Sequence, residues 1–436
     1  MRVYNDPPNQ LDRKCIDELV VSKTRLLFAD YGSSELNGSL WYAEFVGSFV
    51  SDQDCEWEFG LVVCGTGKLY VNDELVIDNA TTQVQGELFF GCATREEKGQ
   101  VFLKKDQRYT IRIDFASTPA RKLTGPAFPG GVLRVGGCKI IDADDEIQRA
   151  CRLAKDADQV IICAGLNGDW ETEGHDRETM DLPGRLVDLI SAVSRANSKT
   201  VLVNQSGTPI TMPWIEQVPA VVQAWYGGNE CGNAIADILF GDANPSGKLS
   251  VTFPVRLQDN PAYLNSRCEG GRTLYGEDVY VGYRYYEHID IPVLFPFGHG
   301  LSYTTFQLSS LSVVDEGEGS ELDRSLQVDV DITNTGNIKG AEVIQVYISH
   351  ENPRVSRPPK EFKGFSKVEL APKEISRIRI SISKKYACAY WDEERARWCV
   401  EKGVYNVRAS NSSDDRNGEV LTEQVTVDET FWWNGL

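Results

Sequence analysis

The sequence predicts a multi-domain protein of mixed class, in which all-β sandwich modules accompany an open, mostly parallel α/β sheet. Its 436 residues are enough for roughly two to four domains of ordinary size. Apolar residues alternate with a period of two in residues 23–140 and again in 301–436, as in half-buried strands. Between them, residues 141–300 alternate helical patterns with short apolar runs, as in strand–helix–strand repeats.

The first β-module is predicted from about Lys23 to Lys139. Trp57, Phe59, Leu61 and Val63 lie two residues apart, as one buried face of a strand requires. Residues 67–78 have the pattern of a hairpin that turns near Asn72-Asp73. The preceding residues 1–22 are expected to be a remnant of the α/β domain or a linker.

The central α/β domain is predicted from three helical patterns that alternate with three buried strands. The strands are Val160-Ile-Ile-Cys-Ala164, Val201-Leu-Val203 and Ala220-Val-Val-Gln-Ala224. Open α/β sheets carry their sites at the carboxyl ends of their strands. We therefore expect any site of this domain to lie in the loops Gly165–Asp176, Asn204–Gly207 and Trp225–Glu230, which are polar and rich in glycine.

A second sandwich, of immunoglobulin or fibronectin type, is predicted at the end of the chain. Leu326, Val328, Val330 and Ile332 alternate along one strand, and the residues from Asn334 to Asn337 form a turn. We expect this module to give structural support.

Composition excludes some classes of function. The formal net charge of −19 argues against nucleic-acid binding, because phosphates would be repelled. No apolar run is long enough to span a bilayer. The eleven cysteines show no CxxC pair or zinc-ligand spacing, and no cofactor or metal is expected. Cys388 and Cys399 flank a predicted hairpin and could pair in an oxidising compartment; the localisation is left open.

A series of motifs resembles family 3 glycoside hydrolases of the β-glucosidase type, in the same order along the chain. These are Glu173-Gly-His-Asp-Arg177 followed by Leu182-Pro-Gly184, Asn204-Gln-Ser-Gly-Thr-Pro209, Gln223-Ala-Trp-Tyr-Gly-Gly-Asn-Glu230, Gly241-Asp-Ala-Asn-Pro-Ser-Gly-Lys-Leu249, Tyr275-Gly-Glu-Asp278 and Phe295-Pro-Phe-Gly-His-Gly-Leu-Ser-Tyr303. The resemblance covers nearly the whole chain. It implies a protective-antigen-type sandwich at 23–140, an α/β sandwich domain at 141–300 and a fibronectin type III-like domain at 301–436.

The resemblance also implies a catalytic role for one residue. In the family, a barrel domain supplies an aspartate nucleophile, and the α/β domain supplies the general acid/base on the loop that matches Glu173 here. The family's insert leans over the active site, so Phe89 and Phe90 are expected to contact the sugar or the leaving group, together with Trp170. Ordinary core packing is the alternative for the two phenylalanines, and a solvated loop position is the alternative for Glu173.

The barrel itself is missing from this sequence. A (β/α)8 barrel needs roughly 250 residues, and the three predicted modules already fill the chain. The family's Ser-Asp-Trp nucleophile motif is also absent. An exposed sheet edge and an uncovered apolar face are expected where the missing parts would dock.

The expected function is therefore the acid/base portion of a retaining β-glucosidase that hydrolyses terminal β-D-glucosyl residues. It is expected to be inactive alone and to need a separate barrel, or to form a homo-oligomer. The alternatives are a non-catalytic carbohydrate-binding or scaffolding pseudoenzyme, or an α/β domain repurposed for other small-molecule chemistry.

Overall fold

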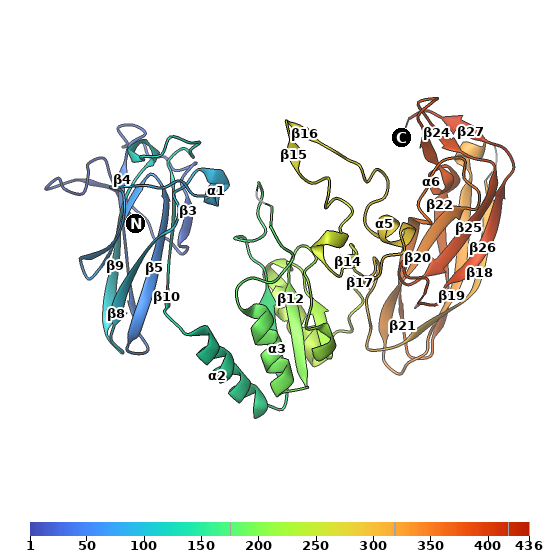
Figure 1. Cartoon of the computed structure of the whole chain (residues 1–436), viewed down its shortest axis with the longest axis horizontal. Helices are drawn as coiled ribbons and strands as arrows, with labels where there is room; N and C mark the ends of the chain where they lie inside the picture. The colour runs from blue at the N-terminus through green and yellow to red at the C-terminus, as the bar shows by residue number, and fades with distance from the viewer. Residues whose placement is uncertain (175, 318–319, 417, 436) are drawn as a thin grey trace. The chain divides into compact units, whose positions relative to one another are not determined.

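The computed structural model describes residues 1–174, 176–317, 320–416 and 418–435 (Figure 1). The chain forms two compact units. Unit 1 comprises Met1–Asp156 and Asn167–Arg177, and unit 2 comprises Ala157–Leu166 and Glu178–Leu436. All-β modules and an α/β sheet are both present, so the predicted mixed class is confirmed.

Unit 1 contains a β-sandwich made of a six-stranded and a four-stranded sheet. The first sheet has the order β2(Cys15–Glu18)-β1(Arg2–Tyr4)-β4(Tyr42–Val50)-β9(Arg108–Ala116)-β6(Thr66–Val71)-β7(Glu74–Asn79). The second has the order β3(Arg25–Leu27)-β10(Val132–Lys139)-β5(Cys55–Cys64)-β8(Glu97–Leu103). Phe59, Leu61 and Val63 are fully or almost fully buried on one face of β5, as the alternation predicts.

The first residues of the chain belong to this sandwich, which corrects the prediction that residues 1–22 are a remnant of the α/β domain or a linker. β1 pairs with β4 and with β2, so it is an internal strand of the six-stranded sheet. Val3 and Tyr4 are buried, and Met1 packs against the sandwich core. A strand of three residues, two of them apolar, is too short to show a period, so the sequence pattern gave no signal for it.

The predicted hairpin is confirmed as β6–β7. Asn72 and Asp73 form its two-residue turn, with φ of 47° and 66°. Left-handed conformations at both turn positions define a type I′ turn, for which asparagine and aspartate are favoured. Helix α2 (Ala143–Lys155) ends the first stretch of unit 1, and its amino terminus is capped by Asp142, whose carboxylate accepts from the backbone N–H of Asp144 and Asp145.

Unit 2 begins with the α/β sheet, a parallel sheet in the order β11(Val160–Gly165)-β12(Thr200–Gln205)-β13(Ala220–Gln223). Helix α3 (Leu186–Ala196) lies beside β12 in Figure 1 and buries Ile190 and Val193. Helix α4 (Cys231–Phe240) follows β13 and ends at Gly241, whose φ of 84° suits the left-handed cap of a helix. Within the described residues β11 pairs only with β12, and Ile161 on β11 is half exposed, so the expected open sheet edge is present.

A long connection of mostly irregular structure leads from this sheet to the last module. It contains two short antiparallel pairs and one short helix. These are β14 (Phe253–Pro254) with β17 (Val293–Phe295), β15 (Cys268–Glu269) with β16 (Arg272–Thr273), and α5 (Tyr283–His288).

The C-terminal sandwich, residues 306–433, has a core formed between two antiparallel sheets. One has the order β18(Phe306–Glu316)-β19(Ser325–Asn334)-β22(Ile375–Ser383), and the other the order β21(Glu361–Leu370)-β20(Gly340–His350)-β25(Gly403–Ser410)-β26(Leu421–Val427). Helix α6 (Lys384–Cys388) and a small sheet, β23(Tyr390–Asp392)-β24(Arg397–Val400)-β27(Phe431–Trp433), complete it. The four alternating residues from Leu326 to Ile332 are fully buried on β19, as predicted.

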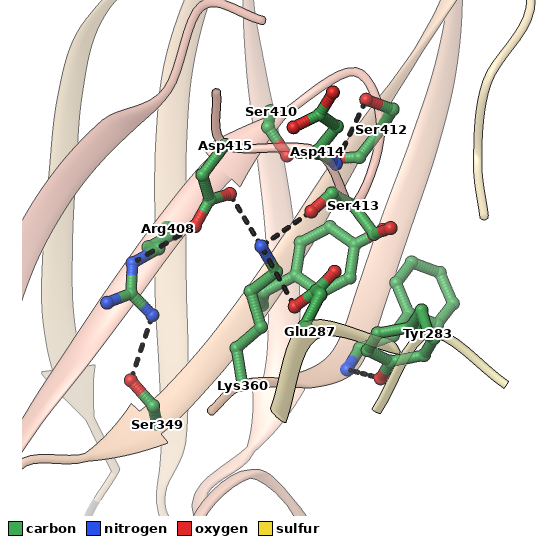
Figure 2. A network of polar contacts seen from close by, with 12 residues as sticks. Tyr283, Glu287, Ser349, Lys360, Arg408, Ser410, Ser412, Ser413, Asp414 and Asp415 are labelled. Carbon is green, nitrogen blue, oxygen red and sulfur yellow. Dashed lines mark hydrogen bonds and ion pairs between the residues drawn. The ribbon is translucent and has the colours of Figure 1, made fainter. Parts of the chain in front are cut away.

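A buried lysine joins the C-terminal sandwich to α5, as Figure 2 shows. Lys360 Nζ lies 2.6 Å from an Asp415 carboxylate oxygen and 3.3 Å from Glu287 on α5, and it donates to the Ser413 carbonyl at 2.6 Å. Burial raises the pKa of Glu287, and the attraction of Lys360 offsets this only in part. The cluster holds one lysine between two carboxylates, and it fixes α5 against the sandwich.

None of the helices in the described part of the chain is both long and apolar enough to cross a membrane. All eleven cysteines are free thiols, so Cys388 and Cys399 are not bonded to each other. Both are buried, and burial raises the pKa of each thiol.

Candidate functional site

The loop that follows β11 is held by the β-sandwich of unit 1. Asp169 forms a two-pronged ion pair with Arg134 on β10, with hydrogen bonds of 2.9 and 2.8 Å. A forked arginine–carboxylate pair fixes orientation as well as position. Both carboxylate oxygens of Asp169 thus bind Arg134.

The start of this loop is a local turn. The side-chain oxygen of Asn167 accepts a hydrogen bond from the backbone N–H of Asp169 at 2.9 Å. The backbone carbonyl of Asn167 accepts from the backbone N–H groups of Trp170 and Glu171. Asparagine stabilises such turns because its side chain replaces a backbone acceptor. Trp170, predicted to contact substrate, follows directly, and its side chain is close to half exposed.

Phe89 and Phe90 lie on α1 (Leu88–Gly91), and both have left-handed backbone angles. Such angles are rare for bulky residues and often occur at functional sites. Phe89 packs against a small buried cluster that includes Val62 and Cys64, and the Arg25 guanidinium lies over its ring at 4.9 Å from the centroid. Phe90 is exposed instead. Core packing therefore accounts for much of Phe89, whereas the Phe90 ring stays largely exposed, 6.1 Å from the ring of Phe128.

The two predicted parts of the site meet at Gly174. A Cβ built on this glycine would lie 3.3 Å from the ring of Phe90, so the ring lies directly against the loop next to Glu173. A Cβ on Gly168 would lie 3.5 Å from the Arg25 guanidinium, which gives the loop a second contact with the same module. Gly174 has a φ of 77°, a conformation that glycine adopts without strain.

Glu173 itself is exposed. Partial burial is the usual environment of a catalytic proton donor, and the described residues leave this carboxyl open. Its neighbour His175, part of the motif that carries the resemblance, lies outside the described residues.

The two other predicted loops start at the carboxyl ends of β12 and β13, and a buried polar network joins them. Asn204 Nδ2 donates to Ser206 Oγ at 2.9 Å and to Gln223 Oε1 at 2.6 Å, and Gln223 returns a hydrogen bond to the Ser206 carbonyl at 3.0 Å. Among the described residues, the side-chain oxygen Oδ1 of Asn204 is buried and accepts no hydrogen bond. The network fixes the two loops to each other.

The second carboxylate pair of the sequence, Glu277 and Asp278, makes local contacts. Glu277 accepts a hydrogen bond from Asn265 at 3.2 Å, and Asp278 occupies a left-handed turn position. Burial and the nearby Lys248 lower the pKa of His299, whose ring stacks on Phe295. Within the residues described, no group of three or more His, Cys, Asp or Glu side chains gathers in a way that could hold a metal ion.

Sequence reasoning missed the two arginines that hold the loop, Arg25 and Arg134. Each arginine is separated from its partner by about 35 or more positions in the sequence, and no local sequence pattern predicts a contact over such a separation. What the arrangement offers chemically is one exposed carboxyl beside an exposed aromatic ring, on a loop fixed by a forked ion pair.

Comparison with known proteins identifies two domains in this chain. Residues 63–303 match the glycosyl hydrolase family 3 C-terminal domain, and residues 342–413 match a fibronectin type III-like domain. A probable beta-glucosidase I of Aspergillus clavatus is 48% identical over 441 residues, which cover all of this chain and 52% of the relative. A probable beta-glucosidase H of Emericella nidulans is 49% identical over 438 residues, or 99% of this chain and 52% of the relative.

The solved structures give the same result. The crystal structure of a β-glucosidase from Kluyveromyces marxianus, 44% identical, superposes with a TM-score of 0.93 over all of this chain and 51% of its own. The chain thus spans about half the length of the relatives it matches, and the half that it spans includes the family's C-terminal domain. The chain belongs to glycoside hydrolase family 3.

Proposed function

We propose that this chain is the acid/base-bearing portion of a retaining β-glucosidase, with Glu173 as the general acid/base. The observation that carries the proposal is the way the Glu173 loop is fixed. Arg134 anchors Asp169 at its start, and Phe90 lies against Gly174 next to the carboxyl. A proton donor must be held within hydrogen-bond reach of the glycosidic oxygen, and an anchored loop meets that need.

The chemistry needs a second carboxylate, about 5–5.5 Å from the first. In the first step, Glu173 would give its proton to the glycosidic oxygen while the C1–O bond breaks and the second carboxylate bonds to C1. In the second step, the Glu173 carboxylate would take a proton from the water that attacks C1 and releases the nucleophile. We assign the second carboxylate to a barrel domain in the half of the relatives that this chain does not span.

The same half would supply the enclosure that Glu173 lacks here. Closing a site removes water around the proton donor and strengthens every electrostatic interaction within it. The substrate class that we propose is a terminal β-D-glucoside or β-linked oligosaccharide. Trp170 on the loop and Phe90 against it, both exposed, would pack against the sugar or its leaving group.

Turnover of 4-nitrophenyl β-glucoside tests the proposal, with this chain alone and with the missing half supplied as a second polypeptide. We expect release of 4-nitrophenol only from the combination. Glu173→Gln should lower turnover by about 10²–10⁴-fold for a glucoside with a poor leaving group, and far less for the 4-nitrophenyl substrate. Glu178→Gln is the matched control, an exposed acid five positions along the chain. Sugar binding without turnover by the combination would favour the non-catalytic carbohydrate-binding alternative instead.

A further inference from the structure

Residues 260–282 form a projecting segment, called the arm, that buries little of its own apolar surface. Leu264, Leu274 and Tyr275 are 77%, 67% and 83% exposed. Tyr263, Val279 and Val281 are also exposed. Scattered apolar residues on a surface are ordinary, but a concentration of six large ones within 19 positions marks an interaction site.

The arm nevertheless has a defined shape. The β15–β16 pair turns at Gly270 and Gly271, both with positive φ, and Asn265 donates to Glu277 at 3.2 Å across the two limbs of the arm. A two-stranded pair of this length is marginal by itself in water. Ordering such a segment costs conformational entropy that its few internal contacts do not offset. A covering surface would offset it.

The length of the relatives indicates what that surface is. The arm lies within residues 63–303, so it is part of the family 3 C-terminal domain rather than an addition to it. All of this chain superposes at a TM-score of 0.93 on a β-glucosidase of which it covers only 51%. The arm thus belongs to a domain that, in this relative, is part of a chain about twice as long, where a further half is available to cover it.

We infer that the arm is the docking element for the complementary half of a family 3 β-glucosidase, and that Leu264, Leu274 and Tyr275 are its main contacts. This inference rests on the proposed function only for the identity of the partner. The arm has a net charge of −1, from two arginines (Arg267 and Arg272) and three acidic residues (Glu269, Glu277 and Asp278). The association is thus driven by apolar burial and depends little on salt.

Co-purification tests the inference. The probe is the part of the Kluyveromyces marxianus β-glucosidase outside the match, tagged and co-expressed with this full chain. We expect capture of the chain at micromolar concentration, little changed between low and high salt. Leu264→Ser, Leu274→Ser and Tyr275→Ser together are expected to weaken capture by about tenfold or more.

Ile375→Ser is the matched control, because Ile375 is 67% exposed on β22 of the C-terminal sandwich, away from the arm in sequence. The three substituted side chains are exposed, so circular dichroism of each arm variant should match the parent. Equal capture of parent and arm variant, or no capture of the parent, would overturn the inference. So would a dimer of this chain that the arm variant dissolves, because the occupant would then be a second copy.

Capture is scored without substrate, which separates this inference from the proposed function. A complex that forms through the arm but releases no 4-nitrophenol leaves the docking role standing and refutes the catalytic one. If the arm variant forms a complex that turns over substrate as well as the parent complex does, the docking role is refuted and the catalytic one stands.

Discussion

Removing the buried Lys360 should destabilise unit 2 more than any surface charge substitution. The side chain of Lys360 is 4% exposed, and Lys360→Met leaves the Glu287 and Asp415 carboxylates facing each other without their cation (Figure 2). Breaking a buried ion pair by removing one partner costs roughly 3–5 kcal/mol. Because Asp415 is 37% exposed and can be partly solvated, the lower end of about 3 kcal/mol is expected.

Differential scanning calorimetry measures this effect as a shift of the unit 2 transition. For a domain of this size, about 3 kcal/mol corresponds to roughly 6–12 °C. Lys339→Met is the matched control: Lys339 pairs with Glu369 at 2.6 Å, but both side chains are 63% exposed. Exposed pairs contribute about 0–1 kcal/mol. If Lys360→Met and Lys339→Met shifted the transition equally, the buried cluster would have no special role.

A pH series extends this prediction through Glu287. Burial raises the pKa of Glu287 above its ordinary value of 4.5, so the folded state binds this proton more tightly than the unfolded state. Its contribution to stability is complete below pH 4.5 and is lost as the pH rises through the raised pKa. The parent should therefore lose stability relative to Glu287→Gln above pH 4.5, and Glu287→Gln should also recover part of the loss in Lys360→Met. A parent and a Glu287→Gln variant with parallel pH profiles would show that the carboxyl has an ordinary pKa.

Three further predictions follow from the polar contacts. Asn204→Ala removes two buried hydrogen bonds and should lower the stability of the α/β sheet by about 1–3 kcal/mol in urea unfolding; no change would mean that the network is dispensable. Arg134→Gln releases Asp169, so amide exchange in residues 167–174 should become faster while that of β10 stays unchanged; unchanged loop exchange would contradict the anchor. Burial raises the pKa of Asp78, but hydrogen bonds from the following turn and from Lys68 outweigh it and hold the pKa well below its ordinary 3.8. The stability that this carboxylate adds is therefore present above pH 3.8 and lost in stronger acid. Asp78→Asn should lack this stability at pH 6 as well, measured as a lower unfolding midpoint by circular dichroism.

The sequence predicted those parts of the fold that depend on local periodicity. The buried face of β5, the type I′ turn at Asn72-Asp73 and the parallel strands of the α/β sheet are each encoded within a few adjacent residues. The strand at Arg2–Tyr4 escaped prediction because its pairing with β4 depends on residues about 40 positions away. Short strands of this kind are specified by their neighbours in space.

In the candidate site, too, local sequence predicted some features, whereas contacts between distant segments determine the others. The motif identified the loop of Glu173, and its resemblance to the family suggested the role. The contacts that position the loop, from Arg134 and from Phe90, join segments far apart in the chain, and only the folded structure brings them together. The left-handed angles of Phe89 and Phe90 were equally invisible, because nothing in two adjacent phenylalanines favours that conformation.

The most direct test of the account compares leaving groups in the reconstituted complex of this chain and its complementary half. A general acid assists the departure of a poor leaving group, whereas 4-nitrophenolate departs with little help. We predict that Glu173→Gln lowers kcat/KM for methyl β-glucoside by about 10²–10⁴-fold, and for 4-nitrophenyl β-glucoside far less. Equal losses for the two substrates, or no loss for either, would contradict the assignment of Glu173 as the proton donor.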